Sequence, residues 1–151
     1  MFVENQFVFR QGHFTYMAIL KLVNDISEEL YQGNCFIGLI IDLSNASDTV
    51  DHKLLLSKME HYDIRVNSLL WFSSYLSDRN QYASLNQTNS QTLPVTCGVP
   101  QGSIVGPLLF ISFINDIVNT SKIAECIMFF DDADLFFKHK ELGVLYATIN
   151  I

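Results

Sequence analysis

Apolar residues in the first third of the chain change from a helical spacing to a strand-like run. Between His13 and Gln32 they recur every three or four positions, at Ala18, Ile19, Leu22, Val23, Ile26 and Leu30. This spacing predicts an amphipathic helix over 13–32, which Gly33 would end. The next segment, 35–41, is continuously apolar and has the length of one strand, so we predict a strand buried on both faces.

The remaining segments alternate between helical and strand-like patterns. We predict helices containing 54–59 and 69–76, a hairpin of strands 81–85 and 92–97 around the polar run 86–91, a helix over 104–119, strands 127–130 and 133–137, and a helix over 140–151. Ser103 is the expected N-cap of the helix over 104–119, and Pro107 falls in its first turn, where a missing N–H costs little.

This order of elements predicts one domain of the mixed α/β (α+β) class, with helices packed against a small, mostly antiparallel sheet. The 151 residues are 49% hydrophobic and include 12 Phe and 6 Tyr, which is enough for one real core. The net charge of −7, from 16 acids and 9 bases, argues against tight autonomous binding to a nucleic-acid backbone. We therefore expect weak nucleic-acid binding.

Cysteine and histidine positions give no metal-site or disulfide pattern. Cys35, Cys97 and Cys126 are odd in number and far apart, and the four His residues lack the spacing of zinc ligands. Reduced thiols, an N-terminus without a secretory pattern and the absence of a membrane-length apolar run predict an intracellular protein, in the nucleus or the cytoplasm, that is not secreted and makes no membrane contact.

Carboxylates follow two of the predicted strands. Asp42 ends the first, and Asp131 and Asp132 are adjacent between two apolar runs. Adjacent like charges resist burial without a counter-charge, and hard oxygen ligands suit Mg²⁺. If the strands are neighbours, the three carboxylates converge as two-metal phosphoryl transfer requires. The alternatives are an Asp-rich hairpin in water and, less favoured, a phospho-acceptor receiver domain.

Three longer segments then resemble the palm motifs of reverse transcriptases from non-LTR retrotransposons. The segment 41–52, IDLSNASDTVDH, is similar to the first motif, and 97–110, CGVPQGSIVGPLLF, is similar to the second almost letter for letter. The segment 129–132, FFDD, is similar to the third. The segments 6–13 and 69–81 fit the same family's fingers and connecting region, so the resemblance covers nearly the whole chain.

The resemblance implies a right-hand polymerase palm with part of the fingers and no thumb. Residues 1–34 would be a fingers remnant, and 35–151 the palm with its connecting helices and hairpin. The activity implied is RNA-directed DNA polymerisation with an RNA template, a DNA primer, deoxynucleotides and two Mg²⁺ (or Mn²⁺) ions. Asp42, Asp131 and Asp132 would be the catalytic metal ligands. The nucleotide- and template-binding positions would be Arg10, Leu43, Ser47, Gln101 and Gly102.

Three departures from the family's pattern predict a partial copy with little or no activity. The family has an aromatic residue at the position of Ser47, which packs beneath the nucleotide sugar, and a small residue at the position of Phe130. A Phe-to-Ser change removes buried surface, and a phenyl ring in a close-packed turn causes strain. The chain also ends shortly after the third motif. A non-enzymatic acidic interaction module, or a remnant without function, is the alternative.

Five other side chains receive simpler assignments. Asp48 and Asp51 are expected to cap the helix that follows them. Trp71 and Tyr75 lie four positions apart and are expected to pack in the core rather than to stack on bases. Asp134 is expected to be solvated.

Overall fold

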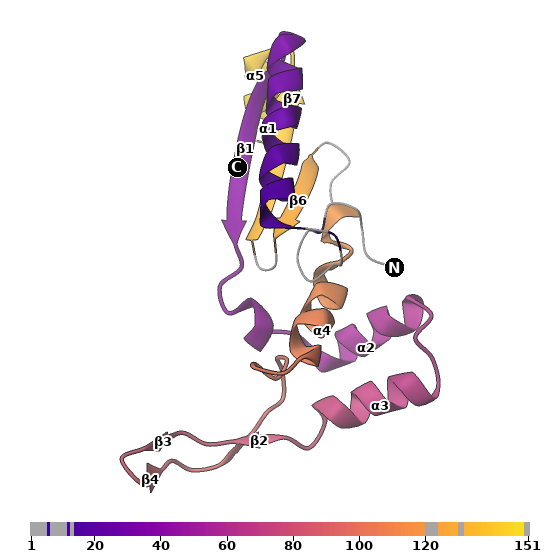
Figure 1. Cartoon of the computed structure of the whole chain (residues 1–151), viewed down its shortest axis with the longest axis vertical. Coiled ribbons are helices and arrows are strands. Elements are labelled where there is room, and N and C mark those ends of the chain that lie inside the picture. Colours follow the sequence, from indigo (N-terminus) through magenta and orange to yellow (C-terminus); the bar gives the residue numbers. More distant parts are fainter. Residues whose placement is uncertain (1–5, 7–11, 13, 120–123, 130–131, 150–151) are drawn as a thin grey trace. The chain divides into compact units, whose positions relative to one another are not determined.

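A computed structural model describes residues 6, 12, 14–119, 124–129 and 132–149. The chain divides into two compact units, shown together in Figure 1. The sheet unit comprises Phe2–Ser44 and Asn115–Ile151, and the helical unit comprises Asn45–Ile114. Each unit is described separately below.

The sheet unit is built on three antiparallel strands in the order β1 (Cys35–Asp42), β7 (Asp132–His139) and β6 (Glu125–Phe129). All three coincide with predicted strands, and β7 lies in the centre. The prediction that the strand at 35–41 is buried on both faces is wrong, because β1 lies at the edge of the described sheet, has no buried residue and leaves Ile40 77% exposed. Gln6 adds an isolated parallel bridge to Met128 of β6. The predicted fold class, helices on a small antiparallel sheet, is confirmed. The antiparallel order also argues against the receiver alternative, because that fold has a parallel sheet.

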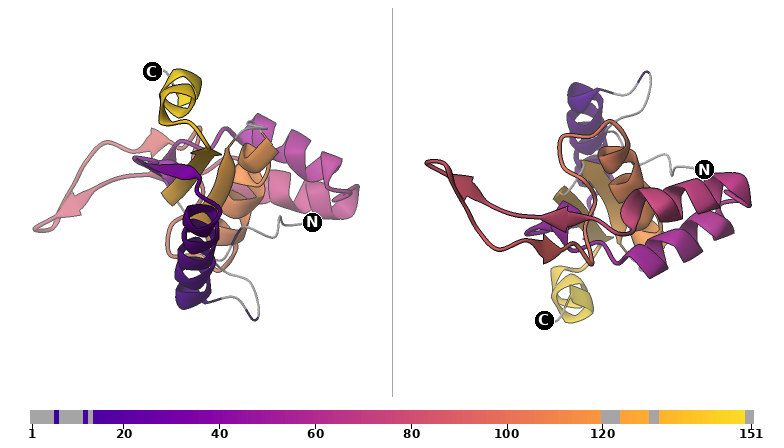
Figure 2. Two further views of the ribbon diagram at one scale, coloured as in Figure 1. Left: turned by 90° about the horizontal axis from the view of Figure 1, so that it is seen from above. Right: turned by 90° about the horizontal axis from the view of Figure 1, so that it is seen from below.

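Helices cover both faces of this sheet. Figure 2 shows α1 (Thr15–Tyr31) and α5 (Leu142–Ile149) on opposite sides of the strands. On the α1 side, Ala18, Ile127 and Phe136 form a buried cluster, which Met17, Leu22 and Phe36 extend. Each of these helices matches a predicted one, although three of the apolar positions that predicted α1, Ile19, Val23 and Leu30, are more than half exposed. The division at residue 34 into fingers and palm remains a prediction.

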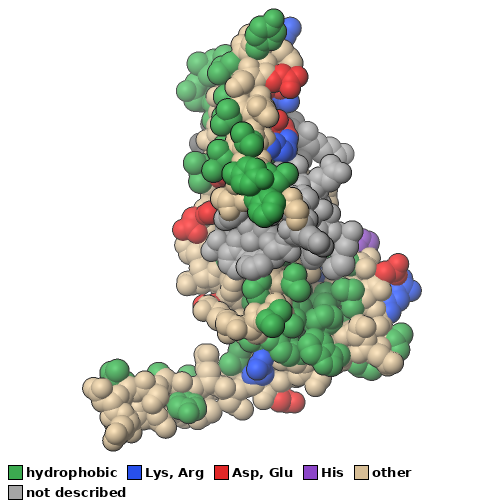
Figure 3. Space-filling view, in the orientation of Figure 1, with side chains coloured by type: hydrophobic (Ala, Val, Ile, Leu, Met, Phe, Trp, Pro, Cys, Tyr) green, Lys and Arg blue, Asp and Glu red, His purple; other side chains and the backbone are tan. Residues whose placement is uncertain are grey.

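The outward face of α1 stays apolar. Tyr16, Ile19, Leu20 and Val23 are each more than half exposed, and Figure 3 shows hydrophobic side chains along this helix. None of the helices in the described part of the chain is long and apolar enough to cross a membrane.

An ion pair ties the end of α1 to the sheet. The Lys138 ammonium donates to the Glu29 carboxylate at 2.6 Å, and the Asn34 amide donates to the same side chain at 2.7 Å. These hydrogen bonds, that from Lys138 first, lower the pKa of Glu29. The nearly buried carboxylate is therefore kept ionised by its partners.

The helical unit packs α2 (His52–His61), α3 (Asn67–Leu76) and α4 (Val105–Ile114) around a separate core. Its fully buried side chains include Val50, Leu55, Met59, Leu76, Leu109, Phe110 and Ile111. Asp51 caps α2, because its carboxylate accepts the Leu54 N–H at 2.8 Å, as predicted. The Ser103 hydroxyl likewise accepts the Gly106 N–H at 2.9 Å at the start of α4, which confirms its capping role.

The predicted helix over 104–119 is too long. Helix α4 ends at Ile114, and a short 3₁₀ turn, η2 (Ile117–Asn119), follows. The polar pair Asn115-Asp116 interrupts the apolar pattern at this point, and such side chains compete with helical hydrogen bonds. The Asn119 N–H bonds to the Asp116 carbonyl at 2.9 Å instead.

The predicted hairpin forms with a tighter turn than expected. Strand β2 (Asn80–Gln81) pairs with β5 (Leu93–Pro94), and β3 (Ser84–Leu85) pairs with β4 (Thr88–Asn89). The two residues between β3 and β4, Asn86 and Gln87, have φ of 48° and 64°. Positive φ at both central positions is the geometry of a two-residue hairpin turn. Figure 1 shows the hairpin as an arm extending from the helices of its unit.

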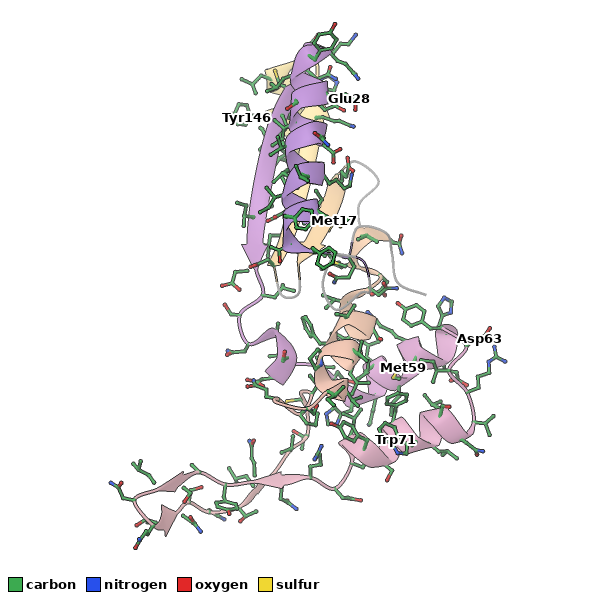
Figure 4. All side chains as sticks on the ribbon, viewed as in Figure 1. Met17, Glu28, Met59, Asp63, Trp71 and Tyr146 are labelled. Carbon is green, nitrogen blue, oxygen red and sulfur yellow. The ribbon has the colours of Figure 1, made fainter. Side chains whose placement is uncertain are left out.

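The core assignment of Trp71 is wrong. Its side chain is 52% exposed, and its ring stacks on Tyr75 with centroids 5.3 Å apart. The Arg79 guanidinium lies 5.1 Å from the centre of the Tyr75 ring, so the stack continues along the surface of α3. Figure 4 labels Trp71 on this helix.

Candidate functional site

Two of the three predicted metal-binding carboxylates face each other across the central ladder. Asp42, the last residue of β1, is the register partner of Asp132, the first residue of β7. Side chains of cross-strand partners lie on the same face with Cβ atoms about 4.5–5.5 Å apart. Both residues are exposed. The ladder thus brings Asp42 and Asp132 together, as expected if the two strands are neighbours. Asp131 lies outside the described residues.

Asp134 lies on the same face of β7, two residues beyond Asp132. Its ladder partners are the apolar Ile40 and Ile127. Within the described part of the chain, its buried Oδ1 atom has no hydrogen-bond partner. Burial and, second, the charge of Asp132 raise the pKa of Asp134. The expectation that Asp134 is solvated is therefore wrong, because its neighbours remove water from one of its oxygens.

The two paired carboxylates fit part of a divalent-cation site. Carboxylate oxygens are the ligands that Mg²⁺ prefers, and two on one sheet face can share an ion. Among the residues that the structure describes, no group of three or more His, Cys, Asp or Glu side chains could hold a metal ion. This statement does not cover the third predicted ligand, Asp131, because Asp131 lies outside the described residues.

The second motif forms a loop, 98–102, that is bonded to the end of the first motif within the helical unit. The Gly98 N–H donates to the Val50 carbonyl at 2.8 Å, and the Val99 N–H donates to the Ser47 carbonyl at 2.7 Å. Gly98 has φ +84°, and a Cβ there would lie 2.8 Å from the Asp48 carbonyl oxygen. Only glycine allows this approach of the two backbones.

Two side chains of the first motif also contact this loop. The Gln101 amide donates from Nε2 to Asp48 Oδ1 at 2.7 Å. The His52 Nε2 is 2.7 Å from the Gly98 carbonyl oxygen, which can only accept, so this ring nitrogen donates. The predicted capping role of Asp48 is wrong, since Asp51 caps α2. From sequence, His52 is expected to have only a structural or solvated role, and its partner could not be predicted because it is a backbone carbonyl 46 residues away.

A cavity of about 690 Å³ lies beside the loop in the helical unit. Its lining includes one carboxylate, one guanidinium, an imidazole and a thiol, from Asp48, Arg79, His52 and Cys97. Gln101 completes the polar side of the lining. Its volume is in the range of small-molecule clefts.

The other predicted site residues are distributed over both units. Leu43 directly follows β1 in the sheet unit, and Ser47 lies in the 3₁₀ turn η1 (Ala46–Asp48) of the helical unit. Gly102 has φ +73° with open space where a Cβ would be. Arg10 and Phe130 lie outside the described residues. The catalytic and binding roles of all these residues remain predictions.

Comparison with known proteins identifies the family. The profile described as "Reverse transcriptase (RNA-dependent DNA polymerase)" matches residues 1–149. The chain is 31% identical over 120 residues to the RNA-directed DNA polymerase from mobile element jockey of Drosophila melanogaster, covering 80% of this chain and 13% of that protein. It is 32% identical over 120 residues to the probable RNA-directed DNA polymerase from transposon BS of the same species, covering 76% and 12%.

A third relative, the probable RNA-directed DNA polymerase from transposon X-element of Drosophila melanogaster, is 31% identical over 113 residues, which is 75% of this chain and 12% of that protein. The chain thus spans about one eighth of the length of the curated relatives that it matches. The resemblance seen in the three motifs is confirmed. This chain belongs to the reverse transcriptase (RNA-dependent DNA polymerase) family and resembles the polymerases of non-LTR retrotransposons.

Proposed function

We propose that this chain carries the palm carboxylates of an RNA-directed DNA polymerase and that this copy has little or no activity. The observation that carries the proposal is the register of the β1–β7 ladder, which pairs Asp42 with Asp132. The substrates would be deoxynucleotides, with an RNA template and a DNA primer. Arg10, Gln101 and Gly102 would lie along the nucleotide and the template.

Asp42, Asp131 and Asp132, with the Leu43 carbonyl, would hold two Mg²⁺ or Mn²⁺ ions. Such ions activate a hydroxyl and stabilise the leaving pyrophosphate. The chain itself contributes the fixed spacing of the carboxylates, because the antiparallel ladder holds Asp42 and Asp132 on one face.

Cation binding tests this assignment without requiring activity. Free Mn²⁺ is measured by electron paramagnetic resonance as the chain is titrated. We expect Asp42→Asn, Asp131→Asn and Asp132→Asn each to weaken binding by about tenfold or more, because each removes an anionic ligand. Asp78→Asn is the matched control, because Asp78 is exposed and has φ 55°, a conformation that Asn also adopts readily. Equal weakening by the control, or no weakening by Asp42→Asn, would contradict the assignment.

Reduced activity is proposed from Ser47 and Phe130. Ser47 would leave open the space where the family's aromatic ring meets the sugar, and Phe130, which lies outside the described residues, replaces the small residue that the family has before its Asp pair. Misplacement of about 1 Å at a reacting centre can cost roughly a hundredfold in rate. The test places this segment in a longer active relative and measures single-nucleotide incorporation. We expect Phe130→Ala to recover rate and Ser47→Phe to recover discrimination against ribonucleotides. Normal rate and selectivity before either reversion would refute this part of the proposal.

The chain itself should bind a primer–template weakly at physiological salt, since 9 bases are set against 16 acids. Primer extension on an RNA template with Mg²⁺ or Mn²⁺ separates a residual enzyme from a non-enzymatic remnant. A sub-micromolar, salt-sensitive affinity would show that the acidic balance does not govern binding.

A further inference from the structure

The segment 47–52 holds the loop 98–102 through side chains as well as through backbone. Two backbone hydrogen bonds join the segments, from Gly98 to Val50 and from Val99 to Ser47. A backbone bridge also pairs Asp51 with Cys97. These contacts fix the path of the loop but not the orientation of any side chain on it. The orientation depends on Asp48 and His52.

The backbone of Asp48 is held in place by its contacts with Asn45 and Gly98. Its N–H donates to the Asn45 carbonyl at 2.9 Å, and its backbone atoms lie within 3.0 Å of where a Gly98 Cβ would be. Its carboxylate, which accepts hydrogen bonds and has no proton to donate when ionised, is 2.7 Å from Gln101 Nε2. The NH₂ end of the Gln101 amide must therefore face Asp48. The carbonyl end, Oε1, then points away from Asp48.

His52 restrains the same loop from its other end. Its Nε2–H donates to the Gly98 carbonyl at 2.7 Å, which fixes the peptide plane between Gly98 and Val99. Gln101 follows only three residues later. His52 thus restrains the backbone that carries Gln101, and Asp48 sets which end of the Gln101 amide faces the segment 47–52.

We propose that Asp48 is a positioning residue that fixes the sense of the Gln101 amide, so that Gln101 presents the acceptor Oε1 to a hydrogen-bond donor of a bound nucleotide. The donor would be a hydroxyl of the sugar or an N–H of the base. The claim that Gln101 binds a nucleotide, called the nucleotide half below, rests on the proposed function. The claim that Asp48 orients the Gln101 amide, called the orientation half, concerns this chain alone. Without an anionic partner, the amide can turn over and present a donor instead.

Orientation rather than stability is the expected contribution of this hydrogen bond. Asp48 and Gln101 are both exposed, so water competes for their polar groups. Asp48→Asn should therefore leave the urea midpoint of unfolding nearly unchanged. A structural role alone would not couple the Gln101 amide to the charge of residue 48.

The test is nuclear magnetic resonance of the ¹⁵N-labelled 151-residue chain, in which the side-chain amide signals of Gln101 are followed as pH is lowered. We expect these signals to shift as the Asp48 carboxyl takes up a proton and the shift to be lost in Asp48→Asn. Asp51→Asn is the matched control, because it removes a nearby carboxylate that bonds to Leu54 instead, and the shift should persist. A shift that survives in Asp48→Asn, or that is absent from the unmodified chain, would overturn the proposal.

A double variant reverses the pair. Asp48→Asn combined with Gln101→Glu puts the amide at position 48 and the carboxylate at position 101. The position-48 amide signals should then follow pH, as those of Gln101 did before. Failure of this reversal would show that the two side chains do not face each other in solution.

The nucleotide half has its own readout. Deoxyadenosine triphosphate with Mg²⁺ should shift the Gln101 amide signals of the unmodified chain. Dideoxyadenosine triphosphate, which lacks the sugar 3′-hydroxyl but keeps the base, separates sugar donors from base donors. If the coupling to Asp48 is present but no nucleotide shifts Gln101, the nucleotide half is overturned and the orientation half stands. Retained Mn²⁺ binding at Asp42 and Asp132 would then show that the proposed function has not failed with it.

Discussion

Substitution of Gly98 by alanine should destabilise the helical unit by more than substitution of Gly102. Both glycines have positive φ, 84° and 73°. An L-residue in this region costs about 1–2 kcal/mol. Only Gly98 also faces other atoms, because a Cβ there would lie 2.8–3.0 Å from the carbonyl oxygen, Cα and carbonyl carbon of Asp48. These are backbone atoms, which cannot rotate aside as the end of a side chain can.

The difference between the two variants isolates this overlap. Overpacking of a close contact costs about 1–3 kcal/mol. Alanine also restricts the unfolded chain more than glycine does, which stabilises the folded state by about 0.4–1 kcal/mol at each site. We therefore expect a loss of about 2–4 kcal/mol for Gly98→Ala and of about 1 kcal/mol or less for Gly102→Ala. Against a typical total stability of about 5–15 kcal/mol, the first loss is large.

The assay is equilibrium unfolding in urea, followed by the fluorescence of Trp71. This is the only tryptophan of the chain, and it lies in the same unit as both glycines. Circular dichroism at 222 nm provides a second probe of whether the transition is two-state. If Gly98→Ala unfolds at the same urea concentration as Gly102→Ala, the close approach of the Asp48 backbone to the loop does not exist in solution.

Five further substitutions, at four positions, test the packing and electrostatics of the two units. Leu55 is fully buried and its neighbour Leu54 is 48% exposed, so Leu55→Ala should lower the free energy of unfolding by about 2–5 kcal/mol, and Leu54→Ala should cost much less. Asp51→Ala should cost about 0.5–2 kcal/mol through loss of the α2 cap, whereas Asp51→Asn should be nearly neutral in the same urea assay. The pKa of Glu29 is lowered in the folded state, chiefly by Lys138, so its stabilisation is present above the ordinary pKa of 4.5 and is lost as pH falls through the lowered value. Glu29→Gln should therefore lower the urea midpoint at pH 7, and the two midpoints should converge in acid; a gap that persists there would exclude the Lys138 ion pair as its cause.

The sheet could be predicted because its signals are local. A continuous apolar run such as 35–41 has the length and composition of a strand, although its predicted burial on both faces is wrong because β1 lies at the edge of the described sheet. The antiparallel pairing of β6 with β7 follows from the two residues that separate them, since so short a connection allows only a hairpin. The pairing of β1 with β7 is only a condition of the carboxylate hypothesis at the level of sequence, and the ladder meets that condition.

The errors concern side chains whose surroundings come from distant parts of the chain. Asp48 has the right residue type and position for a helix cap, but its carboxylate accepts a hydrogen bond from Gln101, 53 residues later, instead. Trp71 has the size of a core residue, yet Leu76, on the same helix, is the side chain of α3 that is buried. Neither outcome is encoded in the spacing around the residue itself. Each depends on which segment packs against it.

The pairing of the carboxylates is ultimately fixed by packing four residues away from them. Phe136 is the ladder partner of Gly38, and its ring lies 3.1 Å from where a Gly38 Cβ would be. Glycine is the residue that leaves room for this ring, which also stacks on Phe36 with centroids 5.3 Å apart. A slip of one residue would place the ring against Ile37 or Leu39 and turn Phe136 away from the α1 core. The same slip would put Asp132 on the opposite face from Asp42. The apolar cluster therefore sets the register, and the register places the two candidate metal ligands side by side.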